Sequence, residues 1–378
     1  MTGPRYTTLR DRHEALGATF TDFGGWMMPV RYSSDLAEHH AVRTAAGLFD
    51  ISHMAEFTVE GTGAGELLDY ALAGRLSTMA VGKAKYSLVL AESGGIVDDV
   101  IVYRLAETRF LVIANAGNRD AVAEALAERA DTVRGRHAGI DLAVADVTDD
   151  FALVAVQGPA ARGILESVDG ISDLDRPLSE LPYYAAASGR FRERPLLVAR
   201  TGYTGEDGFE LLVPTDAAAE LWDALLAAGE PAGLMPAGLA ARDTLRLEAG
   251  MPLYGHELSP DIVPAQAGLG RVVAADKPDF VGKAGLGAVI AGAAPVLVGL
   301  IGEGRRAGRA GYTVHLAEDD TPVGEITSGA LSPTLGHPIA MAFVAPSAAT
   351  PGTPLTIDVR GTRLPVTVTA LPFYRRTN

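Results

Sequence analysis

The chain has 378 residues, enough for two or three domains, and its 48% hydrophobic and 21% charged residues are typical of a globular protein. It contains no cysteine, which excludes disulfides, thiolate nucleophiles, zinc–thiolate sites and iron–sulfur clusters. The formal charge of −15 argues against non-specific binding to nucleic acid or to an anionic membrane.

Targeting signals are not evident. Residues 1–17 mix charges and lack the continuous apolar stretch of a secretory signal. No segment approaches the roughly 20 apolar residues that span a bilayer. We therefore expect a soluble, cytoplasmic protein that binds neither nucleic acid nor membrane.

The first elements predict mixed α and β structure. Residues 22–32, with two glycines, a tryptophan and a proline, predict an irregular or short-strand segment. The Ser-Ser-Asp run at 33–35 offers N-cap oxygens for a helix that continues to about Ala46 and ends at Gly47.

The region 55–135 predicts a compact α+β unit. A strand at 57–59 and a short helix at 65–72 precede three strands, joined first by a glycine turn at 92–95. The three strands are expected at residues 85–90, 96–105 and 109–114. A helix is expected after them, beginning at residue 118 or 120 and ending near residue 130.

Beyond Phe151 short apolar strands again alternate with helices. Thr215 and Asp216 are expected to cap a helix that Gly229 ends, and a second helix is expected at 239–248. The last hundred residues predict a small all-β domain, with strands at 296–301, 312–316, 322–327, 339–344, 354–359 and 364–369.

Common catalytic motifs are missing. The chain has no P-loop, no H-E-x-x-H and no G-x-S-x-G, and the glycines of residues 61–65 lack dinucleotide-binding spacing, so we interpret them as a helix entry. His39 and His40 are adjacent, so their side chains diverge on a helix. We expect no metal site and no bound nucleotide.

Four polar clusters remain. Asp98 and Asp99 follow a glycine turn, so one carboxylate faces a cleft on a strand, or both lie at a turn exit in water. The loop 201–210 either approaches a flat ligand through its glycines or is a long hairpin turn. A helix with Arg242, Asp243 and Arg246 can pair internally, and residues 327–336 are expected to form a loop. These clusters predict an acid-lined pocket for a flat polar ligand.

The sequence resembles the T proteins (aminomethyltransferases) of the glycine cleavage system along nearly its whole length. The longer matching segments include RTGYTGEDGFE and GLAARDTLRLEAGMPLYGHE. All of them follow the family's order, at residues 22–32, 38–54, 94–104, 156–161, 200–210, 238–257, 279–286 and 327–336.

The resemblance implies an α+β, three-domain T-protein fold around a central folate cavity, with a small C-terminal β-barrel. Domain 1 would comprise residues 1–54 plus 141–279, domain 2 a ferredoxin-like unit at 55–140, and domain 3 residues 280–378. It also implies transfer of the aminomethyl group's methylene from the lipoyl arm of H protein to tetrahydrofolate. Ammonia leaves and 5,10-methylenetetrahydrofolate forms.

The resemblance also implies the residues of the site. The family's essential aspartate aligns with Asp99, its pteridine-binding glutamate with Glu206, and an arginine that meets folate with Arg242. Tyr203 lies in the same loop as the glutamate. The remaining positions expected at the folate cavity are Met54, Tyr86, Asp98, Asn115, Tyr254 and Arg375.

Two other functions are considered. Folate-dependent demethylases share the fold but use another one-carbon donor, and a requirement for lipoylated H protein would distinguish them. Folate-binding accessory proteins of iron–sulfur maintenance carry a cysteine in their signature loop, whereas this chain reads TGYTGE there.

Overall fold

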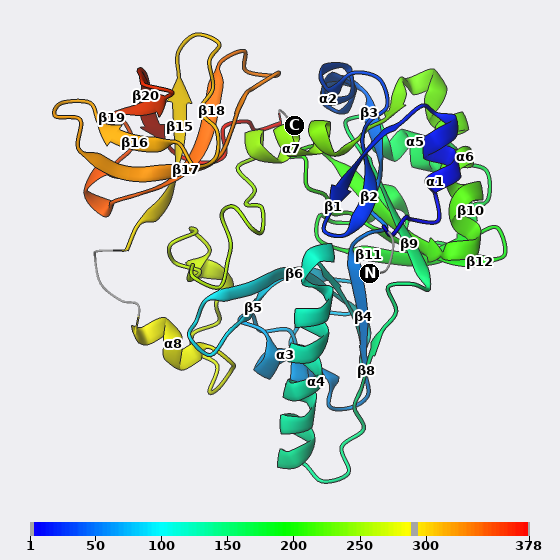
Figure 1. The fold of residues 1–378 in the computed structure, drawn as a ribbon. Coiled ribbons are helices and arrows are strands. Elements are labelled where there is room, and N and C mark those ends of the chain that lie inside the picture. The colour runs from blue at the N-terminus through cyan, green and yellow to red at the C-terminus, as the bar shows by residue number, and fades with distance from the viewer. Residues whose placement is uncertain (1–3, 289–293, 377–378) are drawn as a thin grey trace. The chain divides into compact units, whose positions relative to one another are not determined.

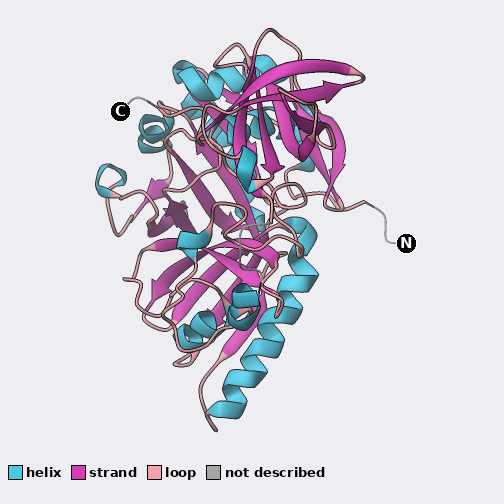
Figure 2. Cartoon of the chain, turned by 90° about the vertical axis from the view of Figure 1, so that its left-hand side faces the viewer, coloured by secondary structure: helices cyan, strands magenta, loops and turns pink. Residues whose placement is uncertain are grey.

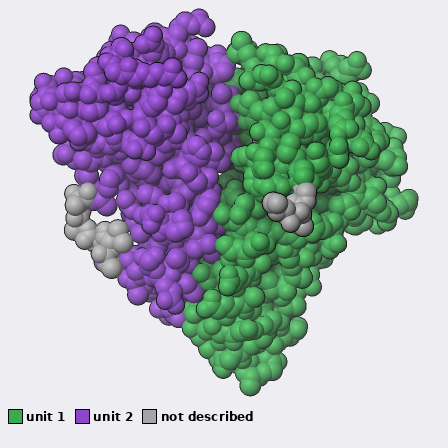
Figure 3. Space-filling view, viewed as in Figure 1, with its two compact units in different colours: residues 1–87, 100–202, 206–242 green, residues 88–99, 203–205, 243–378 purple. Residues whose placement is uncertain are grey.

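The computed structural model describes residues 4–288 and 294–376 (Figure 1), and these fold into two compact units. Unit 1 comprises residues 1–87, 100–202 and 206–242, and unit 2 comprises residues 88–99, 203–205 and 243–378 (Figure 3). The division into three domains stays a prediction.

A seven-stranded sheet forms the core of unit 1. Its strands follow the order β10 (Ile171–Ser172), β11 (Ala186–Phe191), β12 (Arg194–Ala199), β13 (Gly208–Pro214), β9 (Phe151–Gln157), β3 (Ala46–Asp50) and β14 (Leu234–Pro236). Residues 152–157 of β9 are all buried, as expected for an apolar strand at the centre of a sheet. Helices α5 (Ala161–Ser167) and α6 (Ala218–Gly229) contribute Leu165, Leu221 and Trp222 to the same core.

The N-terminal part of unit 1 consists of helix α1 (Arg10–Ala15), the hairpin β1 (Thr19–Phe23) and β2 (Trp26–Arg31), and helix α2 (Asp35–Thr44). Ser34 caps α2 as expected, since its hydroxyl accepts from the amide of Ala37. The predicted end of this helix was wrong, because residues 46 and 47 already belong to β3. Gly47 serves packing here: a Cβ on it would lie 2.5 Å from Cγ2 of Val42.

A second sheet has five strands in the order β5 (Ala84–Leu90), β6 (Ile96–Ala106), β7 (Arg109–Ala114), β4 (Ala55–Glu60) and β8 (Ala143–Asp146). Helix α3 (Ala64–Ala71) packs against the long helix α4 (Arg119–Arg136), seen as the longest coil in Figure 2. The prediction that the helix now labelled α4 ends near residue 130 was wrong. Its buried face continues from Leu126 and Ala130 to Val133, and the helix follows it.

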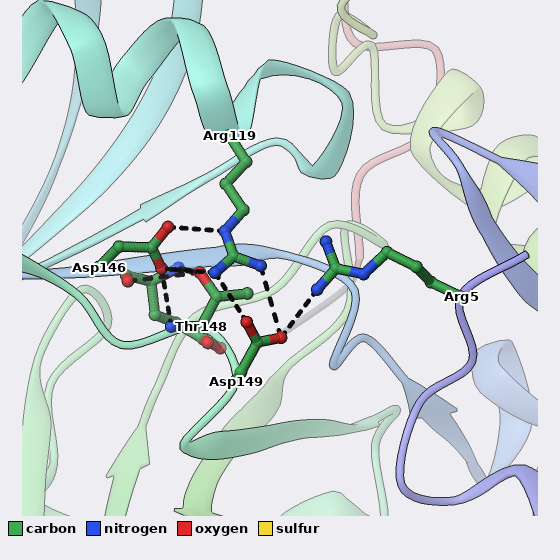
Figure 4. A network of polar contacts seen from close by, with 6 residues as sticks. Arg5, Arg119, Asp146, Thr148 and Asp149 are labelled. Carbon is green, nitrogen blue, oxygen red and sulfur yellow. Dashed lines mark hydrogen bonds and ion pairs between the residues drawn. The ribbon is translucent and has the colours of Figure 1, made fainter. Parts of the chain in front are cut away.

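A charged network joins the N-terminal segment to this sheet within unit 1 (Figure 4). The Arg119 guanidinium donates to Asp146 at 2.6 and 3.0 Å and to Asp149 at 2.9 and 3.4 Å. Arg5 donates to the second of these carboxylates at 2.7 Å. The hydroxyl of Thr148 donates to Asp146 at 2.6 Å. One arginine on α4 therefore holds both the acid that ends β8 and the acid three residues after it.

Unit 2 contains a closed barrel, as the sequence predicts. Its strands follow the order β15 (Val296–Gly302), β18 (Pro338–Val344), β17 (Pro322–Leu331), β16 (Thr313–Leu316), β19 (Pro354–Val359) and β20 (Thr362–Thr369). Short helix α8 (Lys283–Ala288) precedes the barrel. The expectation of a loop at 327–336 was wrong for its first half, since β17 continues through Leu331 with Ile326, Ser328 and Ala330 buried in alternation.

Helix α7 (Leu239–Glu248) has the predicted bounds. The predicted cap of α6 was wrong, because residues 215–217 form a 3-10 turn and no side chain caps the helix. No helix among the described residues is long and apolar enough to cross a membrane.

Candidate functional site

The sequence-predicted residues fall into two groups, one in each unit. Unit 1 holds Met54, Tyr86, Asn115, Glu206 and Arg242, and unit 2 holds Asp98, Asp99, Tyr203, Tyr254 and Arg375.

Glu206 lies in a buried ion pair of unit 1. Its Oε1 accepts from Nη1 of Arg43 on α2 at 2.9 Å, and the two side chains are only 5% and 4% exposed. A buried carboxylate needs such a partner to remain charged. The pair fixes the Glu206 side chain across 163 residues of sequence. Arg43 was not among the residues expected from the sequence, although it lies in one of the matching segments.

The glycines around Glu206 make room for a buried amide. The loop joins the antiparallel strands β12 and β13, so the hairpin interpretation was right. Gln157 donates from Nε2 to the Thr201 carbonyl at 3.1 Å. A Cβ at Gly202 would lie 2.0 Å from Oε1 of that glutamine, and one at Gly208 would lie 2.5 Å from its Nε2. At these two positions the glycines make room for the Gln157 side chain, and the approach of the loop to a ligand stays a prediction.

Arg242 lines a small cavity of about 10 Å³ in unit 1, together with Tyr32, Phe49 and Asp50. Burial, and then the positive charge of Arg242, lower the pKa of His53 to about 4, although Asp50 opposes this shift. His53 is therefore neutral near pH 7, and Arg242 supplies the positive charge there. A cavity of this volume has room for about one water molecule.

A buried hydrogen-bond chain fixes Asp50 at the end of β3. Its Oδ2 accepts from the Thr7 hydroxyl at 2.6 Å and lies 2.8 Å from Nε2 of His13, whose Nδ1 lies 2.9 Å from the Tyr32 hydroxyl. The amide of Ser52 donates to its Oδ1 at 2.9 Å. Burial works against ionisation of Asp50, yet these hydrogen bonds and the charge of His13 leave its pKa below the ordinary value. The wall of the cavity is thus a fixed carboxylate.

In unit 2, Asp98 and Asp99 lie within β6, and their burial alternates along the strand. Asp98 is 0% exposed and Asp99 is partly buried, so the alternative with both carboxylates in water was wrong. Burial, followed by the charges of Asp98 and Asp99, raises the pKa of Tyr254. The phenol and the two carboxylates therefore form one local group.

The turn before β6 is fixed to the segment that follows Tyr254. The amide of Ile96 donates to the carbonyl oxygens of Ser259 at 3.1 Å and Ile262 at 3.0 Å. A Cβ on Gly95 would lie 1.7 Å from the carbonyl oxygen of Pro260, so only glycine fits. The backbone that carries the two aspartates is thereby held against one stretch of unit 2.

Tyr203 and Arg375 differ in their surroundings. The hydroxyl of Tyr203 donates to the carbonyl oxygen of Pro252 at 2.5 Å, within unit 2. Arg375 is exposed, one residue after Tyr374, whose amide donates to the carbonyl oxygen of Glu248. The phenol is thus committed to a backbone contact, whereas the guanidinium extends from an anchored tail.

Three expected residues of unit 1 are partly buried and lie at or near strand ends. Met54 ends the turn after β3, Tyr86 lies on β5, and Asn115 follows β7, where its carbonyl oxygen accepts from the amide of Asn118. Among residues 4–288 and 294–376, no group of three or more histidines and acids is placed to hold a metal ion.

Comparison with known proteins agrees with this architecture. Residues 9–277 match the family model described as the GCVT N-terminal domain, and residues 296–375 match the glycine cleavage T-protein C-terminal barrel domain. An aminomethyltransferase of Cutibacterium acnes is 56% identical over the full length of both chains. One of Streptomyces avermitilis is 55% identical and covers 99% of this chain and 98% of its own.

A solved structure also resembles the chain. The glycine cleavage system aminomethyltransferase T of Bartonella henselae superposes with a TM-score of 0.87 at 36% identity, over 98% of each chain. The chain therefore belongs to the glycine cleavage T-protein family, the aminomethyltransferases.

Proposed function

We propose that this aminomethyltransferase transfers the methylene of an aminomethyl group from the lipoyl arm of H protein to tetrahydrofolate, with Asp99 as the catalytic carboxylate. N5 and N10 of the folate each form a bond to the methylene carbon, while the carbon's bonds to sulfur and to the amine nitrogen break. The two protons lost from N5 and N10 leave on the lipoyl thiol and on ammonia. No metal is required for this balance.

Asp99 suits this role because charge develops at the reacting carbon. As the amine departs, the methylene becomes a cationic iminium, which a carboxylate stabilises electrostatically. Asp99 is partly buried on β6, and Asp98 beside it is fully buried. The partial exposure of Asp99 at the position of the family's essential aspartate is the observation that carries the proposal. A carboxylate that is only partly solvated interacts with a cation more strongly than one in water.

The other residues bind the folate in this proposal. Glu206, oriented by Arg43, accepts hydrogen bonds from the pteridine. Arg242 binds folate through its positive charge, whereas the neighbouring His53 is neutral. The resemblance assigns folate contacts also to Met54, Tyr86 and Asn115 of unit 1 and to Asp98, Tyr203, Tyr254 and Arg375 of unit 2. A cytoplasmic location also stays a prediction.

The proposal is tested by following 5,10-methylenetetrahydrofolate formation from aminomethyl-loaded H protein and tetrahydrofolate. Free lipoamide and methylated donors serve as substrate controls. We expect turnover to depend on H protein, and Asp99→Asn to retain folate binding while losing most turnover. Asp11→Asn, an exposed acid on α1, is the matched control with normal turnover.

Two results would contradict the proposal. Near-normal turnover by Asp99→Asn would remove the catalytic role of that carboxylate. Turnover of a methylated donor, with none of H protein, would assign a folate-dependent demethylase.

A further inference from the structure

The last turn of α7 buries a guanidinium that the reaction itself does not use. Arg246 is 2% exposed and donates to Oε2 of Glu257 at 3.0 Å and to the hydroxyl of Ser328 at 2.8 Å. It also donates to Asp243 at 2.8 Å, which is the internal pairing that the sequence allowed. All of these residues belong to unit 2.

Glu257 ties this helix to the turn that follows it. The side chain is 0% exposed, and its Oε2 accepts both from Arg246 and from the amide of Leu253 at 2.9 Å. The amide of Glu257 donates back to the carbonyl oxygen of Leu253 at 2.9 Å. The amide of Gly255 donates to the carbonyl oxygen of Leu258 at 2.8 Å. Residues 253–258 therefore form a closed turn with a carboxylate at its base.

This turn carries Tyr254, whose phenol lies in the electrostatic field of Asp98 and Asp99. The segment directly after the turn accepts the amide hydrogen of Ile96, which leads into those two residues. A shift of the turn would therefore change the surroundings of Asp99 directly.

The ionic nature of the Arg246–Glu257 pair is not explained by stability. A buried ion pair is often matched or exceeded in stability by apolar residues of similar volume, because burying both charges is costly. Its directional hydrogen bonds, however, connect α7 to the turn through Oε2 of Glu257 and to strand β17 through the hydroxyl of Ser328. An apolar pair would fill the space without fixing that geometry.

We propose that Arg246 and Glu257 are positioning residues for one-carbon transfer, which hold the 253–258 turn so that Tyr254 stays beside Asp99. The proposal rests on the proposed function of Asp99. Neither residue touches substrate: Arg246 acts through Glu257, and Glu257 acts through the backbone of the turn.

The decisive variant is the double substitution Arg246→Met with Glu257→Leu, which replaces the charged pair by apolar side chains. We expect it to fold with a thermal midpoint close to that of the wild type, because no charge is left buried without a partner. Its kcat should fall roughly tenfold, which corresponds to about 1.4 kcal/mol. The KM for tetrahydrofolate should change less, because Glu206 and Arg242, the two charged side chains proposed to bind the folate, lie in the other unit.

A second readout does not depend on turnover. With 3-fluorotyrosine at position 254, we expect the fluorine resonance of the double variant to shift and broaden relative to the wild type. The matched control is Arg129→Met, which removes a buried arginine of unit 1 whose Nη1 donates to the carbonyl oxygen of Ala71. It should lower stability but leave kcat and the fluorine signal unchanged.

A folded double variant with wild-type kcat and an unchanged resonance would overturn the proposal, since the pair would then be merely structural. If that variant does not fold, Arg246→Lys decides, because it keeps a buried cation but lacks the two guanidinium nitrogens that donate to Glu257 and to Ser328. A smaller loss of kcat with a shift of the resonance supports positioning, and wild-type values for both overturn it. If the wild type shows no turnover with H protein, the proposed function fails, while the fluorine signal still tests the pair.

Discussion

Replacing Arg119 by glutamine removes the cation shared by two carboxylates of unit 1, and the structure predicts the cost. Asp146 is 29% exposed and makes two hydrogen bonds with the guanidinium, which is itself 18% exposed. A hydrogen bond to a charged group contributes about 1.5–3 kcal/mol, and partial exposure favours the lower end. Asp149 is 66% exposed, so its pair adds at most about 0.5 kcal/mol. We expect a total loss of about 2 kcal/mol.

The loss should depend on pH in a defined direction. The hydrogen bonds of Arg119 lower the pKa of Asp149, and at Asp146 the hydrogen bonds from Arg119 and Thr148 outweigh the opposing effect of burial. A lowered folded-state pKa contributes stability above the unfolded-state value of about 3.9, and this contribution disappears as the pH falls through the folded-state pKa. The difference in unfolding free energy between the wild type and Arg119→Gln should be fully present near pH 7 and should shrink below about pH 4.

Buried Glu56 should respond as well. Neither of its carboxylate oxygens has a hydrogen-bond partner among the described residues. Its pKa is well above the ordinary value, mainly because of burial and secondly because of Asp146, while Arg119 opposes the shift. Removing the arginine should therefore raise the pKa of Glu56 further.

Urea unfolding followed by tryptophan fluorescence measures the loss of unfolding free energy in unit 1, where Arg119 lies. The chain has two tryptophans, Trp26 and Trp222, and both are buried in unit 1. The unfolding free energy is obtained by linear extrapolation at several pH values. Arg10→Gln, which breaks an exposed pair with Glu14 on α1, is the control and should have no measurable effect. Equal stability of wild type and Arg119→Gln at pH 7, or a difference that persists unchanged at pH 3, would refute the reasoning.

Two further predictions concern the surroundings of the site. Gly95→Ala should destabilise unit 2 and reduce turnover, because its Cβ would lie 1.7 Å from the carbonyl oxygen of Pro260; normal activity and thermal midpoint would contradict this close contact. His53 should titrate near pH 4 by NMR, and since its folded pKa lies below the unfolded value of about 6.5, its contribution to stability should be lost as the pH falls from 6.5 toward 4. A measured pKa near 6.5 would show that its ring is solvated.

Much of the fold could be predicted because the relevant signals are local. The bounds of α7 and the positions of the six barrel strands follow from apolar periodicity and from glycine and proline turns. Errors occurred where packing overrode the local signal: Gly47 is a close-packed strand residue, and Leu331 still belongs to a strand. The resemblance identified the family, and with it the residues expected in the site.

The sequence by itself therefore predicted helix α7 and an all-β C-terminal domain, and its resemblance to known proteins gave the family and the barrel. Only the tertiary structure showed that Asp98 is buried, that Glu206 pairs with Arg43, and that Arg246 and Glu257 join α7 to the Tyr254 turn. The reason is physical: periodicity and turn chemistry act over a few neighbouring residues, whereas burial and ion pairing depend on side chains that folding brings together from distant parts of the chain.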